Sequence, residues 1–180
     1  MTHQENVLNF WFNELSPKDW YSKDKELDRS IRDKYLELHH AAVQGELWQW
    51  RNSPVGALAE IIVIDQFSRN MFRDTPEAFA YDGIALVLAQ NAVSLSWHRA
   101  LKALQRPFLL MPYMHSESVM IHEQAVKLFN APGLMMSLEY EYKHKAIIDK
   151  FGRYPHRNEI LGRHSTPEEL AFLNEADSSF

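Results

Sequence analysis

Apolar residues recur at intervals of three and four along most of the chain, which is the spacing of an amphipathic helix. Between Lys25 and Gln44 the apolar positions are Leu27, Ile31, Tyr35, Leu38 and Ala42. Gly45 follows them, and glycine commonly ends a helix. Alternating patterns joined by two-residue turns, which indicate β-hairpins, are absent. The pattern therefore predicts helices along the whole chain.

Start and stop signals divide this pattern into segments with short connections. The expected starts are Thr2, Ser16–Pro17, Ser53–Pro54, Thr75–Pro76 and Thr166–Pro167, each with a capping side chain and most with a proline behind it. We expect Thr75–Pro76 to open one helix that runs through to Val93. Two prolines between Arg106 and Asn130 predict a short helix, a break and a longer helix. The result is an all-α fold of about seven to nine helices in antiparallel pairs.

Composition indicates one globular domain over residues 1–180, with 46% hydrophobic and 12% aromatic residues. Residues 1–22 are expected to form an N-terminal helix and a tryptophan-containing turn, and residues 174–180 a polar tail. The formal net charge of −5 argues against binding to nucleic acid, which requires a basic surface. The absence of cysteine excludes disulfides and thiolate metal sites.

The chain shows no targeting or membrane segment. It does not begin with a basic stretch followed by an apolar run, and its longest nearly uncharged stretch, Gly83–Trp97, is too short for a bilayer. We therefore expect a cytoplasmic protein that binds neither membranes nor nucleic acid, with its oligomeric state undetermined. His39 and His40 are expected on an exposed helix face. The tryptophans, expected in the core and between helices, are Trp11, Trp20, Trp48, Trp50 and Trp97.

The first candidate for chemistry is IIVIDQFSRNMFR, residues 61–73. Asp65 follows four apolar residues on a helix, and a buried carboxylate requires a partner. Arg69 lies one turn further on, followed by Asn70 and Arg73. Two interpretations are open: an ion pair that locks two helices together, or an aspartate that orients an arginine or a histidine in a pocket. From the residues alone the structural ion pair is favoured.

The second candidate is YMHSESVMIHEQ, residues 113–124. His115 and His122 are seven residues apart, so on one helix they would share a face. A metal clamp on a helix uses histidines three or four residues apart, which argues against a metal site. An acid–base or hydrogen-bonding role for His115 and Glu117 is favoured instead.

The third candidate is FGRYPHRNEILGR, residues 151–163, where positive charge gathers in an acidic chain. Gly152 is expected to end a helix and Pro155 to begin a short new one. Backbone N–H groups at that start, with Arg153, His156 and Arg157 around them, suit an anion such as a carboxylate or a phosphate. The alternative is that these arginines neutralise Asp65, Asp82 or Glu117 on other helices.

Together these stretches are similar to DUF924, a family of bacterial proteins with no assigned activity. The resemblance rests on VLNFWF near the start, IDQFSRNMFR, AFAYD (78–82), MHSE (114–117), FGRYPHRNEILGR and STPEELAFL. It implies a tetratricopeptide-like helical stack. The family's motif positions fall here on Asp65, Gln66, Arg69, Asn70, Arg73, Asp82, His115, Ser116, Glu117, Arg153, His156, Arg157 and Asn158. Tyr154 stands where Phe is usual, and His122 stands where Gln is expected, which implies that His122 is not essential to a shared function.

Three hypotheses follow from the polar residues. In the first, a helical scaffold binds an anionic small molecule or an acidic peptide end. Its ligand-binding set is Asp65, Gln66, Arg69, Asn70, Arg73, Arg153, Arg157 and Asn158. In the second, the protein is a hydrolase or lyase that uses no cofactor and no metal, with His115 or His156 as general base beside Asp65 or Glu117. In the third, a buried polar network only fixes the helices in register.

Overall fold

The computed structural model describes residues 3–176 and 178, and all regular secondary structure in that part of the chain is helical. The α-helices are α1 (His3–Asn9), α2 (Lys25–Val43), α3 (Pro54–Ile61), α4 (Phe67–Met71), α5 (Asp82–Ser94), α6 (Trp97–Ala100), α7 (Arg106–Met114), α8 (Val119–Phe129), α9 (Met135–Phe151) and α10 (Pro167–Phe172). Residues 62–66 are also helical and join α3 directly to α4, so these ten segments form nine continuous helices. The predicted all-α class is confirmed, whereas the predicted cap Thr2 lies outside the described residues.

Shorter helical turns connect these helices. They are η1 (Phe10–Glu14), η2 (Asp19–Tyr21), η3 (Trp48–Asn52), η4 (Ile62–Gln66), η5 (Pro76–Ala78) and η6 (Pro155–Arg157). Ser53 caps α3 by accepting a hydrogen bond from the N–H of Gly56 at 3.1 Å. Thr166 and Glu169 form the predicted capping box of α10. None of the helices in the described part of the chain is long and apolar enough to cross a membrane.

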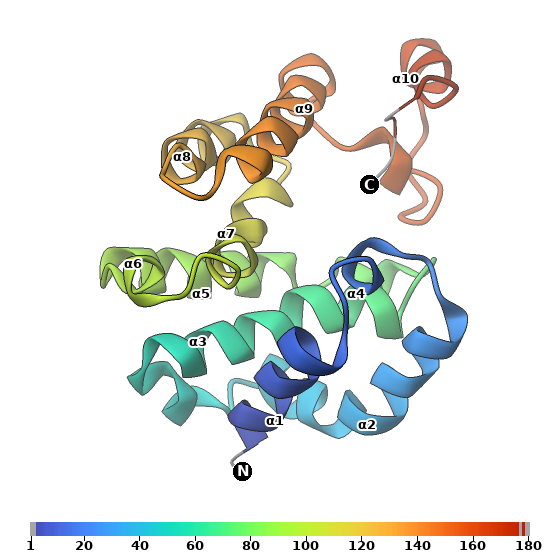
Figure 1. The fold of residues 1–180 in the computed structure, drawn as a ribbon. Coiled ribbons are helices and arrows are strands. Elements are labelled where there is room, and N and C mark those ends of the chain that lie inside the picture. Colours follow the sequence, from blue (N-terminus) through green and yellow to red (C-terminus); the bar gives the residue numbers. More distant parts are fainter. Residues whose placement is uncertain (1–2, 177, 179–180) are drawn as a thin grey trace.

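The helices gather in two groups joined by α7. Figure 1 shows α1 to α6 at one end of the molecule and α8, α9 and α10 at the other. Consecutive helices pack on one another from α7 to α9, and α7 also packs on α5 and α3. The turn between α7 and α8 and the loop between α9 and α10 therefore come from the second group, while α4 and α5 belong to the first. The candidate site lies where these segments meet.

The main core is aromatic and belongs to the first group. Trp11 is 1% exposed and contacts Phe67 and Phe108, with ring centroids 5.7 Å and 5.6 Å apart. The second group has a small core of its own around Ile148 and Tyr154. The prediction that the tryptophans are packed inside is wrong for Trp48, which is 59% exposed.

The predicted helix from Pro76 to Val93 is interrupted. A short 3₁₀ turn, η5, is followed by the residues 79–81, and α5 begins only at Asp82. The interruption has a packing cause, because the ring of Phe79 lies 4.5 Å from the guanidinium carbon of Arg157. A tertiary contact thus overrides local helix propensity.

Two predictions about histidines are corrected. His115 and His122 do not share a helix face, because His115 caps the end of α7 and His122 lies within α8. His39 is not on the surface: it is 0% exposed, and its Nε2 lies 2.7 Å from the Oγ of Ser68. The neighbouring residues of α2 pack against α4, and this contact covers His39.

Candidate functional site

Asp65 is at the centre of a polar cluster between α4, α5, α7 and the loop after α9. The helix from Pro54 to Met71 contains a π-helical turn, η4, and Asp65 lies in that turn. Such turns in α-helices are often found at functional sites. The carboxylate is 0% exposed. One of its oxygens, Oδ1, accepts from His115 and Arg69, and the other, Oδ2, accepts from Gln66.

Two arginines and a second carboxylate complete the cluster. Arg69 binds Asp82 through both terminal nitrogens, at 2.9 Å and 3.0 Å, and reaches Oδ1 of Asp65 at 3.1 Å. Arg157 donates to Asp82 Oδ2 at 3.2 Å. The cluster thus holds two carboxylates and two guanidinium groups, whose charges balance. Burial favours the neutral form of Arg69, but Asp65 and Asp82 outweigh it and raise the pKa of Arg69 above its usual value.

Arg157 is held rigidly. Its guanidinium carbon lies 4.5 Å from the ring of Phe79 and 4.7 Å from the ring of Tyr154, so the group is clamped between two aromatic faces. Its side chain is 7% exposed. Its Nε is buried and has no hydrogen-bond partner among the described residues. Burial lowers the pKa of Arg157, against the opposing effect of Asp82.

His115 and Asp65 form a dyad. The Nδ1 of His115 lies 2.7 Å from Oδ1 of Asp65. Burial opposes ionisation of Asp65, but Arg69 and His115 hold the pKa of its carboxyl below the usual range. An ionised carboxylate only accepts, so the proton of this hydrogen bond sits on Nδ1. Burial and the charge of Arg69 lower the pKa of His115, so the ring is neutral near pH 7 and its Nε2 has a free lone pair.

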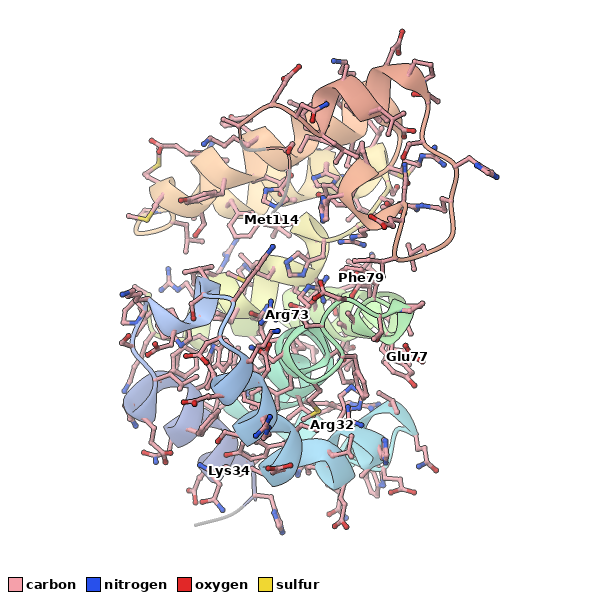
Figure 2. The ribbon with its side chains drawn as sticks, turned by 90° about the vertical axis from the view of Figure 1, so that its right-hand side faces the viewer. Arg32, Lys34, Arg73, Glu77, Phe79 and Met114 are labelled. Atoms are coloured by element: carbon pink, nitrogen blue, oxygen red, sulfur yellow. The ribbon has the colours of Figure 1, made fainter. Side chains whose placement is uncertain are left out.

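A cleft opens beside this dyad. Its volume is about 280 Å³, and its lining includes Phe79, Asp82, His115, Ser116, Glu117 and Arg157. The side chain of His115 is 16% exposed, and its Nε2 bonds to no other residue in the described part of the chain. Figure 2 shows Phe79 and Met114, the residue before His115, near the level where the two groups of helices meet. His115 thus lines the cleft with a ring whose Nε2 is unprotonated and bonds to no other described residue.

Glu117 forms the far side of the cleft and is held by the loop after α9. Arg163 donates to both of its carboxylate oxygens, at 2.7 Å and 2.9 Å, and the backbone N–H of Tyr154 donates at 2.7 Å. Burial favours the protonated form of Glu117, but Arg163 and this N–H outweigh it and lower its pKa. Asn158 supports the arrangement, since its side-chain oxygen accepts from Arg163 at 2.9 Å.

Three consecutive carbonyls at the end of α7 accept hydrogen bonds from side chains. Tyr154 donates to Met114, Arg157 donates to His115 at 3.0 Å, and His122 lies 2.8 Å from the carbonyl of Ser116. A helix end leaves such carbonyls without partners, and these bonds satisfy them. These hydrogen bonds also fix the turn that contains His115, because their donors come from both α8 and the loop after α9.

His122 has a carboxylate partner of its own. Its Nδ1 lies 2.6 Å from Oε1 of Glu141, and both side chains are 0% exposed. The Nε2 of His122 faces a carbonyl and must carry a proton. One further proton lies between His122 and Glu141, and burial raises the pKa of Glu141.

Some residues of the sequence-predicted site lie elsewhere. Arg153 pairs with Glu169 at 2.7 Å and 2.8 Å on the outer side of the loop after α9. Asn70 and Arg73 both bind Asp28 on α2, at 2.6–2.8 Å. His156 packs beside the ring of Tyr154, with centroids 5.5 Å apart. Burial and the charge of Arg157 lower the pKa of His156 to about 4. Of the sequence-predicted residues, the cleft is lined by Asp82, His115, Ser116, Glu117 and Arg157. Asp65, Gln66 and Arg69 belong to the buried cluster next to it.

Sequence reasoning did not assign a role to several residues of the site. Phe79 and Tyr154 clamp Arg157, Arg163 holds Glu117, and Glu141 pairs with His122. Of these, Arg163 gave a signal, because it lies in the basic stretch 151–163. Phe79 and Tyr154 gave no such signal, because aromatic residues in a sequence usually indicate core positions. Among residues 3–176 and 178 no three acidic or histidine side chains are placed to hold a metal ion.

Comparison with known proteins gives two matches. Residues 7–177 match the family model described as "Bacterial protein of unknown function (DUF924)". The solved structure of the "Protein of Unknown Function ATU0120" from Agrobacterium tumefaciens is similar, with 34% sequence identity and a TM-score of 0.91. The likeness covers 96% of this chain and 97% of that chain. A search of the curated proteins finds no match.

Proposed function

The chain belongs to the DUF924 family of bacterial proteins of unknown function, and we propose that its cleft binds a small anionic molecule and acts on it by acid–base chemistry. His115 is the general base, Asp65 orients it, and Arg157 contacts the negative charge of the ligand. The reaction class is a hydrolase or a lyase that needs no cofactor.

One observation carries this proposal. The Nδ1 of His115 is bound to Asp65 at 2.7 Å, while the opposite nitrogen bonds to no other described residue and the ring lines a cleft. A general base must be oriented, unprotonated at the operating pH and within reach of a substrate. Asp65 supplies the orientation, burial supplies the low pKa, and the cleft supplies the access. When Nε2 takes a proton from a substrate or a water molecule, the resulting imidazolium is stabilised by the ionised Asp65.

The anionic nature of the ligand is inferred from Arg157. Its neighbour Asp82 already receives two hydrogen bonds from Arg69, and its own bond to Asp82, at 3.2 Å, is longer than those of Arg69. Arg157 lines the cleft with 7% of its side chain exposed. A carboxylate or phosphate group in the cleft would meet the positive charge of this guanidinium. The volume of about 280 Å³ suits a small molecule or the end of an acidic peptide.

A second candidate is a scaffold that binds without catalysis. The balanced charges of Asp65, Asp82, Arg69 and Arg157 favour it, because balance is what a structural network requires. In this case the polar cluster fixes the helices in register and only Arg157 meets the ligand. The tetratricopeptide-like stacking implied by the resemblance belongs to this proposal, and it is supported by the packing of α7 on α8 and of α8 on α9.

Chemical modification of histidine tests the base. Diethyl pyrocarbonate acylates unprotonated imidazole nitrogens, and mass spectrometry identifies the modified residue. We expect His115 to react, and to remain reactive below the usual pKa of an imidazole because burial lowers the pKa of His115. If His115 stays unmodified in the folded protein while His164 reacts, Nε2 is not accessible and the proposal of a general base is wrong.

A thermal-shift screen with small carboxylates and phosphates tests the anion contact. Arg157→Lys keeps the charge but loses the fork of N–H donors, so it should abolish the shifts that the wild type shows. Arg99→Lys, at an exposed position on α6, is the matched control and should leave them unchanged. Ligand shifts that persist in Arg157→Lys contradict the assignment of Arg157.

A further inference from the structure

A second hollow lies far along the chain from the cleft, between the start of α1 and the 3₁₀ turn η3. Its volume is about 590 Å³, and it is lined by His3, Gln4, Trp48, Gln49, Trp50 and Asn52. Both α1 and η3 pack on α3, and Figure 1 shows α1 near the end of α3 that η3 leads into. None of its lining residues belongs to the acid–base site, so its role is independent of the function proposed above.

The lining has an unusual chemistry. Among the described residues it contains two indole rings, three side-chain amides and the imidazole of His3, but no carboxylate, lysine or arginine. Trp48 is 59% exposed, whereas Trp50 is partly buried and packs against the hydrophobic core. The amides of Gln4, Gln49 and Asn52 form no hydrogen bonds with other residues that the structure describes. Indole faces and planar amides are therefore both available to a ligand.

The backbone around this hollow is fixed. Arg51 binds the fully buried Glu60 through two hydrogen bonds of 2.7 Å, which ties η3 to α3. At Gly56 the packing is so close that an added Cβ would lie 2.1 Å from the carbonyl oxygen of Trp50 and 2.6 Å from the side-chain oxygen of Gln4. A rigid wall that keeps a tryptophan exposed is the preorganised arrangement that favours binding.

We propose that this hollow is a binding site for a neutral carbohydrate, which we define as the indole–amide groove (His3, Gln4, Trp48, Gln49, Trp50 and Asn52). The face of an indole ring is electron-rich, and one face of a pyranose ring presents polarised C–H groups to it. Each hydroxyl group of a sugar both donates and accepts, as each side-chain amide does. A lining whose described residues include no lysine or arginine favours an uncharged ligand over an anionic one.

A proline-rich peptide is the other occupant that an aromatic groove admits. Such a peptide offers carbonyl acceptors but few N–H donors, so it uses only the N–H groups of a lining. The three amides here expose carbonyl oxygens as well as N–H groups, and this mixture matches hydroxyl groups better. The carbohydrate is therefore favoured, and the peptide serves as the comparison in the test.

The test uses the indole N–H resonances of Trp48 and Trp50 in the ¹⁵N-labelled protein, titrated with maltose, cellobiose or a short polyproline peptide. We expect a saturable shift with at least one of the two disaccharides at millimolar concentration, and Trp48→Ala should weaken that binding by at least about tenfold. Gln49→Ala should weaken it as well. Tyr21→Ala, which removes an exposed aromatic side chain outside the groove, should leave it unchanged.

Three outcomes would overturn the inference: no shift with either disaccharide, shifts with polyproline alone, or disaccharide binding that survives Trp48→Ala. Because Trp48 is 59% exposed, its removal should leave the fold intact. The modification of His115 is read from a different part of the chain, so the failure of either proposal can be recognised separately.

Discussion

Asp65→Asn is the substitution that best tests the role of the negative charge in the buried cluster. It keeps the shape of the side chain but removes one negative charge from a position that is 0% exposed. The remaining cluster then has Arg69 and Arg157 against Asp82 alone, an excess of one positive charge. Breaking a buried ion pair by removing one partner typically costs about 3–5 kcal/mol. Native domains have about 5–15 kcal/mol of stability, so we expect a folded variant that is clearly weakened.

The substitution Asp65→Asn should also change the pKa of His115. Oδ1 of Asp65 accepts from Arg69 and His115, while Oδ2 accepts from Gln66. If the asparagine keeps its oxygen toward His115, its N–H₂ group faces the amide of Gln66, which can turn over to present its oxygen. The loss of charge therefore dominates. Since Asp65 raises the pKa of His115, the substitution should lower that pKa further.

Urea denaturation at pH 7 measures the loss of unfolding free energy, and NMR titration of the histidine resonances measures the pKa of His115. Asp149→Asn is the matched control, because Asp149 pairs with Lys145 on the surface of α9 and is 45% exposed. We expect it to cost no more than about 0.5 kcal/mol. If Asp65→Asn costs less than about 1 kcal/mol and leaves the NMR titration of His115 unchanged, Asp65 is not the partner that the structure indicates.

Three further predictions concern stability. Burial lowers the pKa of His39 from 6.5 to about 4, so the unfolded chain binds the proton first as the pH falls. The unfolding free energy should therefore drop by about 1.6 kcal/mol from pH 6.5 to 5 through this residue. His39→Gln, which keeps an N–H toward Ser68, should lose that part of the pH dependence in urea denaturation, and equal slopes would contradict it. Arg153→Ala should lower the thermal midpoint through loss of its pair with Glu169, yet leave ligand shifts unchanged; lost shifts would bring Arg153 into the site. Gly56→Ala should cost about 2 kcal/mol or more, because its Cβ meets the carbonyl oxygen of Trp50, and a neutral effect in urea denaturation would contradict that contact.

Helices were predictable because their signals are local. Ser53 and Thr166 cap the helices that follow them, and Gly152 ends α9 with a φ of +69°. The start of α5 was not predictable, because the ring of Phe79 is drawn out of the helix by Arg157, which lies far along the chain. Local propensity carries no information about such a contact.

The candidate site was predictable in part, for a physical reason. A carboxylate after four apolar residues must find a partner, and Asp65 does find Arg69. Which basic residue of the stretch 151–163 enters the cluster depends on the turn η6, and sequence spacing does not fix that. Arg157 faces the cluster, while Arg153, four residues earlier, faces Glu169. The same stretch therefore supplies both a residue of the cleft and an ion pair outside it.

The strongest distinction between a catalytic site and a structural network rests on one nitrogen. A structural network uses its hydrogen-bonding groups inside the protein, and Asp65, Asp82 and Glu117 do so. The Nε2 of His115 bonds to no other described residue and lies at the cleft. His115→Asn keeps an N–H at the position of Nδ1 and removes Nε2. If the network is all that matters, this variant should match the wild type in every assay.

The acid–base proposal predicts otherwise for His115→Asn. The bond to Asp65 survives, so the unfolding free energy should fall by less than about 1 kcal/mol, the typical net contribution of a hydrogen bond that is lost. Any turnover found for a ligand from the thermal-shift screen should be lost, because no group remains to take the proton, while the ligand still binds through Arg157. His164→Asn, at an exposed position, should retain turnover. Wild-type turnover in His115→Asn would show that the dyad orients the helices and performs no chemistry.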